Sequence, residues 1–245
     1  MLQQTNVNRV LPKWSLFVEV FPTVEECSGA PLGDVLRLWQ GLGYPRRARN
    51  LQAAATAVVE RHDGVMPDTL AALLELPGVG PYTARAVLAF AFEHDSAVVD
   101  TNIARILARF HGRTLKTREA QQLADAWLPP GEAWLWNQAL MDLGATICRP
   151  QSRCDECPLQ RSCAWRGVGD DPSIGSAGVS VAQAKFAGSD RQARGRLLKA
   201  LGECPVALVA IAEVMDRPAE VANRLMINLI DEGLIVRDGA ELRLP

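Results

Sequence analysis

The chain has 245 residues, of which 48% are hydrophobic and 22% are charged, and its formal net charge is -2. This composition is ordinary for a globular protein and excludes wholesale disorder or a fibrous structure. The longest run without a charged residue, 172–184, is short and rich in Gly and Ser, so no transmembrane helix is predicted. The small net charge means that any nucleic-acid site must be local.

The amino-terminal residues carry no secretory signal, because they lack both a basic region and an apolar core. We therefore expect a cytoplasmic protein, in which cysteines are not read first as disulfides. Cys27 and Cys204 stand alone in the sequence and are expected to be buried small hydrophobic residues.

The first 165 residues have the apolar spacing of helices. Ala84, Val87, Leu88 and Ala91, for example, fall at positions i, i+3, i+4 and i+7 and predict one inward-facing stripe. The same pattern predicts helices over Val35–Trp39, Leu51–Val59, Thr83–Phe92, Ile103–Phe110 and Trp134–Leu143. No alternating strand pattern competes with it, so this part of the chain is expected to be all-helical.

The helical pattern stops in the segment 168–185, where Gly, Ser, Asp and Pro predominate, and we interpret this segment as a linker. Beyond it, helices are expected over 191–201, 206–215 and 219–232, followed by two short strands around Asp238-Gly239. Three helices and a hairpin predict a small winged-helix tail. Its first helix is basic and is expected to add DNA contacts through Arg191, Arg194, Arg196 and Lys199.

Two glycines, Gly78 and Gly80, frame a short turn between helical stretches. They allow positive φ angles and leave backbone N–H groups uncovered at a helix start, which suits a phosphate. A plain helix connector is the commoner meaning of a lone pair of this kind. Further along the chain, Asp100 stands where the N-cap of the next helix belongs. The same position would let its carboxylate face a cation.

Four cysteines, Cys148, Cys154, Cys157 and Cys163, lie close together in one loop. Four thiolates can hold either a zinc ion or a [4Fe-4S] cluster. Zinc ribbons present two Cys-x2-Cys knuckles, whereas here a single knuckle is flanked by two distant cysteines. The spacing favours the cluster over zinc, and a disulfide is the least favoured interpretation.

In combination these motifs resemble a known superfamily. Leu76–Gly80 is similar to the hairpin of the helix-hairpin-helix DNA glycosylases, Asp100 matches their catalytic aspartate, and the cysteine loop resembles that of the endonuclease III branch. Within the superfamily, three stretches resemble the adenine DNA glycosylases of the MutY type: Met1–Thr5, Gly41–Tyr44 and Asn137–Ala145. The start of the tail, 186–192, looks like the short extension of actinobacterial members.

The resemblance implies an all-α helix-hairpin-helix glycosylase fold with a small α+β tail. The expected segments are a six-helix barrel over 1–110, an iron–sulfur cluster domain over 111–167, the linker over 168–185 and the tail over 186–245. The implied cofactor is a [4Fe-4S] cluster on the four clustered cysteines. The first gap between these cysteines has one residue fewer than is usual in the family.

The resemblance also implies roles for the matched residues. Asp100 would stabilise or trap an oxocarbenium-like cation, with Tyr82 and Asn102 positioning Asp100 and the attacking water. Endonuclease III has a lysine nucleophile where Tyr82 stands, and a phenol cannot form a Schiff base, so the enzyme is expected to be monofunctional. DNA contacts are expected from Leu2, Gln3, Gln4, Thr5, Tyr44, Gly78, Val79, Gly80 and Gln138. A basic stretch that either contacts the DNA backbone or is a solvated helix face includes Arg37, Arg46, Arg47, Arg49 and Arg61.

The implied function is base-excision repair: hydrolysis of the N-glycosidic bond of adenine mispaired with 8-oxoguanine or guanine. The implied protein is a bacterial, nucleoid-associated monomer that binds double-stranded DNA and no membrane. The family's general-acid glutamate precedes the methionine that opens this chain, so a truncated and impaired enzyme is expected. No domain that reads 8-oxoguanine is apparent in the tail.

Three alternatives remain. A thymine or uracil mismatch glycosylase shares the hairpin, the aspartate and the cysteines, but the opening Leu-Gln-Gln-Thr favours adenine. An endonuclease III is disfavoured by Tyr82. A non-catalytic metal-cluster winged-helix protein would explain the cysteines and the tail, but it leaves Asp100 and the hairpin unexplained.

Overall fold

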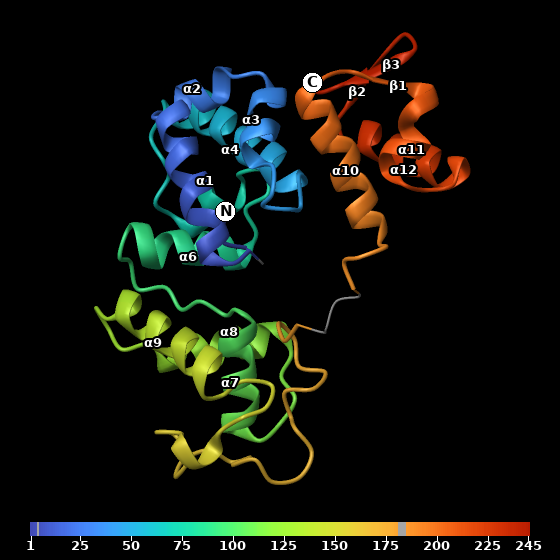
Figure 1. Ribbon diagram of the computed structural model, residues 1–245. Coiled ribbons are helices and arrows are strands. Elements are labelled where there is room, and N and C mark those ends of the chain that lie inside the picture. Colours follow the sequence, from blue (N-terminus) through green and yellow to red (C-terminus); the bar gives the residue numbers. More distant parts are fainter. Residues whose placement is uncertain (4, 181–184) are drawn as a thin grey trace. The chain divides into compact units, whose positions relative to one another are not determined.

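The structure is a computed structural model that describes residues 1–3, 5–180 and 185–245. Its contacts divide the chain into two compact units (Figure 1). The first unit consists of Met1–Pro67, Leu76–Gly78 and Gln183–Pro245, and the second consists of Asp68–Glu75 and Val79–Ala182. The chain therefore passes back and forth between the units, a grouping that differs from the four consecutive segments expected from the sequence.

The first unit joins the two ends of the chain around one core. Its amino-terminal helices are α1 (Val7–Val20), α2 (Val24–Gly29), α3 (Leu32–Trp39) and α4 (Arg46–His62). Its carboxy-terminal helices are α10 (Asp190–Glu203), α11 (Ile211–Met215) and α12 (Ala219–Asp231), with a short 3-10 turn, η2 (Leu208–Ala210), before α11. A single buried apolar cluster contains residues of both sets, among them Val35, Trp39, Leu197 and Leu242.

A three-stranded antiparallel sheet of order β1-β3-β2 completes the tail. Its strands are β1 (Val206–Ala207), β2 (Val236–Asp238) and β3 (Glu241–Arg243), so the expected hairpin around Asp238-Gly239 is confirmed. The helix expected over 206–215 was wrong at its start, because Val206 pairs with Leu242 in the sheet. Pro205 explains the break, since the residue before a proline avoids the helical region and Cys204 is extended.

The tail is fastened to the amino-terminal helices by polar contacts as well as by the core. The Gly33 N–H donates to the carbonyl of Pro245 at 2.9 Å, and a β-carbon at Gly33 would lie 2.7 Å from that oxygen. The buried carboxylate of Glu232 accepts hydrogen bonds from Arg46 and Arg194. The tail is thus part of the fold of the first unit.

The second unit is built around helix α7 (Thr101–His111), whose residues from Ile103 to Arg109 are all buried. Helices α8 (Thr117–Trp127) and α9 (Ala133–Thr146) pack against it. Helix α6 (Pro81–Ala91) packs against α9, and α5 (Leu70–Leu74) packs against α6. A 3-10 turn, η1 (Cys154–Glu156), lies in the cysteine loop. The apolar core of α7 and its neighbours includes Ile103, Leu107, Leu115 and Leu140. The helices expected from apolar spacing are confirmed.

The described part of the expected linker, 168–180 and 185, differs from a free connector. Asp171 pairs with Arg109, the Ser176 hydroxyl accepts from the N–H of Leu115, and the Thr101 hydroxyl bonds to Ser180. Both Ser173 and Ser176 are buried. The segment therefore packs along α7, while residues 181–184 of the expected linker lie outside the described residues. In the described ranges, no helix is long and apolar enough to cross a membrane.

Candidate active site and cysteine cluster

The glycine turn before α6 has the features expected of a phosphate-binding site. Gly78 has a φ of +75°, and a β-carbon there would lie 2.5 Å from Cβ of Asn50, so the position requires glycine. Gly80 is the N-cap of α6, is exposed, and would meet nothing within 4 Å if it carried a side chain. Val79 between them is half-buried. The backbone N–H groups at the start of α6 are therefore open to an anion.

Asp100 is the N-cap of α7, as the sequence predicts. Its Oδ1 accepts hydrogen bonds from the backbone N–H groups of Asn102 at 2.9 Å and Ile103 at 2.7 Å. Its Oδ2 accepts from the side-chain amide of Asn102 at 3.1 Å. Burial raises the pKa of Asp100 above its usual value, and these hydrogen bonds together with the charge of Arg105 oppose that rise. The carboxylate is thus pinned in one orientation in a partly desolvated place.

Tyr82, near the start of α6, lies close enough to Asp100 for the two groups to interact. Burial raises the pKa of the Tyr82 phenol, and the negative charge of Asp100 raises it further. Tyr82 is 39% exposed. The structure therefore brings together the three residues that the sequence singled out for chemistry: Tyr82, Asp100 and Asn102.

Two residues of α9, for which no local sequence pattern predicts this role, support the arrangement. Asn137 is buried and fastens the segment before Asp100, accepting from the Val98 N–H at 2.9 Å and donating to the Ser96 carbonyl at 2.9 Å. Gly144 lies against α7, where a β-carbon would stand 2.5 Å from Cβ of Asn102. Both stand inside the Asn137–Ala145 stretch, and Gln138 of that stretch is half-buried on α9.

Arg105 joins the aspartate region to the cysteine loop. Its guanidinium donates to Oδ1 of Asn102 at 2.8 Å, to the carbonyl of Gly144 at 2.7 Å and to the carbonyl of Cys148 at 2.7 Å. The residue is buried, so each of these hydrogen bonds is made in a partly desolvated place. The apolar pattern of this helix did not predict a buried arginine. Arg105 is buried there and donates to these three oxygens, two of them backbone carbonyls and one a side-chain amide.

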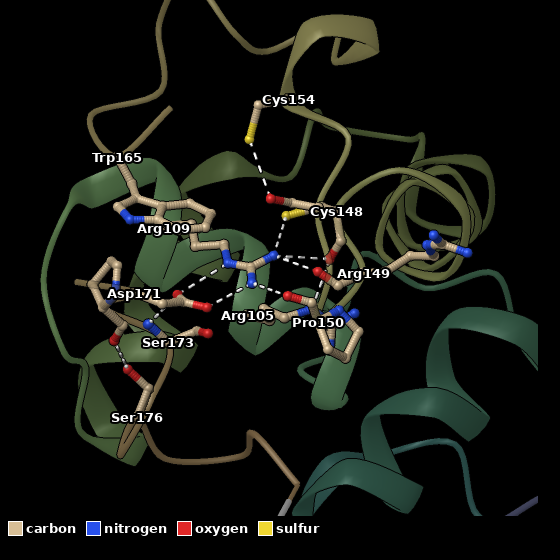
Figure 2. A network of polar contacts seen from close by, with 12 residues as sticks. Arg105, Arg109, Cys148, Arg149, Pro150, Cys154, Trp165, Asp171, Ser173 and Ser176 are labelled. Atoms are coloured by element: carbon tan, nitrogen blue, oxygen red, sulfur yellow. Dashed lines mark hydrogen bonds and ion pairs between the residues drawn. The ribbon is translucent and has the colours of Figure 1, made fainter. Parts of the chain in front are cut away.

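The four clustered cysteines line one small cavity of about 30 Å³, together with Arg109 and Trp165. Arg109 is almost fully buried, lies 4.5 Å from the ring centre of Trp165, and forms a two-pronged ion pair with Asp171. It also reaches Sγ of Cys148 at 3.4 Å, as Figure 2 shows. Four thiols that line one cavity beside a buried cation are the side chains that could hold an anionic group with several atoms. In the described residues, no three Cys, His, Asp or Glu side chains are placed to hold a single metal ion.

The isolated cysteines differ from each other. Cys27 is buried, as expected, and burial raises the pKa of its thiol. Cys204 is exposed, so the expectation that it is buried was wrong. It is the extended C-cap residue of α10 and directly precedes Pro205.

In the first unit, Thr5 and Tyr44 lie near the start of α4. The Thr5 hydroxyl donates to the carbonyl of Leu42 at 3.0 Å, and Leu2 is exposed. Tyr44 has a φ of +49°, an unusual conformation for a residue with a large side chain. Gln3 lies beside them, and Gln4 lies outside the described residues.

The basic stretch differs from an open DNA-contacting face. Arg37 pairs with Asp34, Arg46 pairs with Glu232, and Arg49 donates to the carbonyl of Glu232. Arg47 is turned toward the amino-terminal residues, and Arg61 is exposed. In the tail, Arg194 pairs with Glu232 and Arg196 with Asp216. Four of the nine basic residues named from the sequence are therefore held in ion pairs with carboxylates of the protein itself.

Comparisons with known proteins identify the family of the chain. Residues 1–130 match the model of the HhH-GPD superfamily base excision DNA repair proteins. The chain is 40% identical to the adenine DNA glycosylase of Mycolicibacterium smegmatis, over 96% of this chain and 81% of that protein. It is 42% identical to the adenine DNA glycosylase of Mycobacterium tuberculosis, over 97% of this chain and 80% of that protein. The chain belongs to the adenine DNA glycosylase family.

The chain also has the fold of solved DNA glycosylase structures. A thermostable thymine-DNA glycosylase matches with a TM-score of 0.65 and 29% identity, covering 68% of this chain and 80% of that one. A trapped endonuclease III–DNA covalent intermediate matches with a TM-score of 0.62 over 68% and 80% of the two chains, and at 24% identity it supports the fold alone. The expected glycosylase fold with a small α+β tail is confirmed. The protein is a DNA N-glycosylase, and a non-catalytic DNA-binding protein is not supported.

Proposed function

We propose that this DNA glycosylase removes adenine from mispairs with 8-oxoguanine or guanine in double-stranded DNA, and that it leaves an abasic site without cutting the strand. The observation that carries the proposal is the arrangement of Asp100, Asn102 and Tyr82 at the start of α7 and α6. The relatives that share most of the chain's length are adenine DNA glycosylases, which favours adenine over thymine as the excised base.

Asp100 would act on the sugar after the target nucleotide has left the base stack. As the bond between adenine and C1′ breaks, positive charge develops on the sugar, and a carboxylate fixed beside it stabilises that charge. Two backbone N–H groups hold Oδ1. A carboxylate oxygen can accept two hydrogen bonds, and within the described residues Oδ2 accepts only one, from the side-chain amide of Asn102. Oδ2 is therefore the oxygen suited to meet the cation or a water.

Tyr82 would limit the reaction to hydrolysis of the glycosidic bond, without cleavage of the DNA strand. Its phenol has a raised pKa and stays protonated at neutral pH, so it can donate a hydrogen bond to Asp100 or to the water. A phenol cannot form a Schiff base with C1′, so the covalent amine intermediate that leads to strand cleavage does not form at this position. The expected product is therefore an intact strand with an abasic site.

DNA contacts are proposed at two places. The open backbone N–H groups of Gly78, Val79 and Gly80 would bind phosphates. Leu2, Gln3, Thr5 and Tyr44 in the first unit would contact the duplex near the lesion, and Gln138 would contact the extruded adenine. Gln4 has the same proposed role, although it lies outside the described residues.

The cysteine loop would hold a [4Fe-4S] cluster through Cys148, Cys154, Cys157 and Cys163. The support is their common cavity and the buried Arg109, whose positive charge beside Cys148 suits a set of thiolates. When bound, the cluster supplies a cross-link of the 148–163 loop rather than a reacting group. Arg109 also donates to the carbonyls of Arg149 and Pro150, so it holds the same loop from inside.

We further propose that the enzyme works as a monomer on bacterial nucleoid DNA in the cytoplasm.

The test is base release from four duplexes that differ in one pair: A:8-oxoG, A:G, T:G and A:T. Abasic sites are converted to breaks by alkali, and untreated samples report any strand cleavage by the protein itself. We expect adenine release from the first two duplexes and no breaks without alkali. Release of thymine but not adenine would replace the proposal with a thymine mismatch glycosylase, and breaks without alkali would contradict the role of Tyr82.

A further inference from the structure

Arg47, at the start of α4, is the point where two separate segments of the first unit meet. Its NH1 donates to the carbonyls of Met1 at 2.8 Å and Gln3 at 2.7 Å. Its NH2 donates to the Thr5 hydroxyl at 2.9 Å and to the carbonyls of Leu42 at 2.9 Å and Gly43 at 3.1 Å. One guanidinium therefore ties Met1, Gln3 and Thr5 to the 41–44 loop through five oxygen atoms.

Aromatic rings hold the guanidinium in place. It lies 5.2 Å from the ring centre of Trp39 and 5.6 Å from that of Tyr44. Both distances are within the range of a cation–π contact. The Trp39 indole also donates to the carbonyl of Gly43 at 3.0 Å, so ring and guanidinium act on the same loop.

The loop needs such support because Tyr44 has a positive φ, +49°. For a residue with a large side chain the left-handed region costs about 1–2 kcal/mol, and it persists where surrounding contacts determine it. The contacts from Arg47 to the carbonyls of Leu42 and Gly43 and to the Tyr44 ring are of this kind.

Arg47 also differs from its neighbours in its partners. Arg46 and Arg49 are bound by Glu232 of the tail, through its carboxylate and its carbonyl respectively. The five oxygens that Arg47 contacts belong to carbonyl and hydroxyl groups, and within the described residues no carboxylate forms an ion pair with it. A guanidinium of this kind is suited to fix backbone geometry, since its planar fork orients several acceptors at once.

We propose that Arg47 is a positioning residue that holds the described amino-terminal residues, 1–3 and 5, and the 41–44 loop in one arrangement. This arrangement lets the two segments distinguish a mispair from a matched pair. The second half rests on the proposed function, because it assumes that these segments contact the lesion. The first half concerns the free protein and can be measured without DNA.

The main variant is Arg47→Lys, which keeps the positive charge but replaces a five-donor fork with a single ammonium group. Thr5→Val is a milder variant that keeps the side-chain shape and removes one acceptor of Arg47. The control is Arg46→Lys, at the neighbouring position, where the arginine is exposed and pairs with Glu232.

Hydrogen exchange of the full chain without DNA tests the anchoring. In Arg47→Lys we expect faster exchange in peptides covering 1–6 and 41–45 and a lower thermal midpoint, because hydrogen bonds of the guanidinium are lost. The exchange of α6 to α9 should stay unchanged. Thr5→Val should show a smaller change of the same kind, and Arg46→Lys none in these peptides. Unchanged exchange of both peptides in Arg47→Lys would overturn the proposal.

Binding to A:8-oxoG and A:T duplexes of the same length tests the consequence. We expect Arg47→Lys to weaken binding to the mispair about tenfold, the size of one lost hydrogen bond to a charged group. Binding to the matched duplex and the salt slope should stay unchanged, because the charge is kept. An equal loss on both duplexes would overturn the discriminating role. If the unsubstituted protein shows no preference for the mispair while exchange still responds to Arg47→Lys, the proposed function fails and the anchoring stands.

Discussion

Gly144 lies so close to Asn102 that a β-carbon at Gly144 would stand 2.5 Å from Cβ of Asn102. Helices α9 and α7 are therefore packed backbone against side chain at the residue that holds the Asp100 carboxylate. The absence of a side chain at one position of α9 sets the position of the candidate catalytic group on α7.

Gly144→Ala should lower single-turnover base release by tenfold or more, because Asn102 must move and a shift of about 1 Å in a positioned group can cost 100-fold. Duplex binding should change little. Gly195→Ala on α10 is the matched control, since a β-carbon there would meet nothing within 4 Å. Equal rates for Gly144→Ala and the unsubstituted protein would show that Asn102 does not orient the reacting group.

Asp100→Asn should abolish base release while leaving duplex binding nearly intact. The amide oxygen can still cap α7, but the negative charge that would face the sugar cation is gone. The loss expected is at least 100- to 1,000-fold in the single-turnover rate. Retained excision by this variant would mean that Asp100 is a helix cap without a chemical role.

Asn102→Ala should move the acid limb of the pH–rate profile to higher pH. Base release requires ionised Asp100, so the rate falls as the pH drops through the pKa of that carboxyl. Burial already raises this pKa, and the Asn102 amide is one of the hydrogen bonds that oppose the rise. Removing the amide therefore raises the pKa further. An acid limb that stays in place would contradict the hydrogen-bond assignment.

The protein purified without oxygen should be yellow-brown and carry about four irons per chain, as expected for a [4Fe-4S] cluster on four cysteines. Cys157→Ser should lose most of the iron. Cys204→Ser is the control, because that thiol is exposed and lies outside the cysteine cavity. Stoichiometric zinc without iron would favour the zinc interpretation of the same four thiols.

Glu232→Gln should destabilise the first unit at neutral pH and remove a pH dependence. Arg194 and Arg46 lower the pKa of Glu232 from 4.5 to about 2. The stabilisation by the ionised carboxylate is thus present above about pH 4.5 and is lost as the pH falls toward 2. We expect a loss of about 2–3 kcal/mol at pH 7, measured by urea unfolding. A difference between the two proteins that is the same at pH 7 and pH 3 would contradict the lowered pKa.

The sequence by itself determined which local elements form and which residues suit the chemistry. Apolar spacing of 3.6 residues marks the helices, Gly78 and Gly80 mark the turn before α6, and Asp100 marks the start of α7, because each depends only on residues near it in the chain. The clustering of four cysteines is likewise local. These signals, with the family resemblance, were sufficient to identify a DNA glycosylase.

Only the tertiary structure decided which distant residues support the site. Gly144 contacts Asn102, Arg105 reaches the cysteine loop, and Glu232 of the tail takes up two arginines that looked free for DNA. No local pattern encodes these pairings, because charge and hydrogen-bond partners are assigned when helices far apart in sequence pack together. A buried polar group must find a partner there, so an arginine that appears basic in the sequence becomes a structural link within the fold.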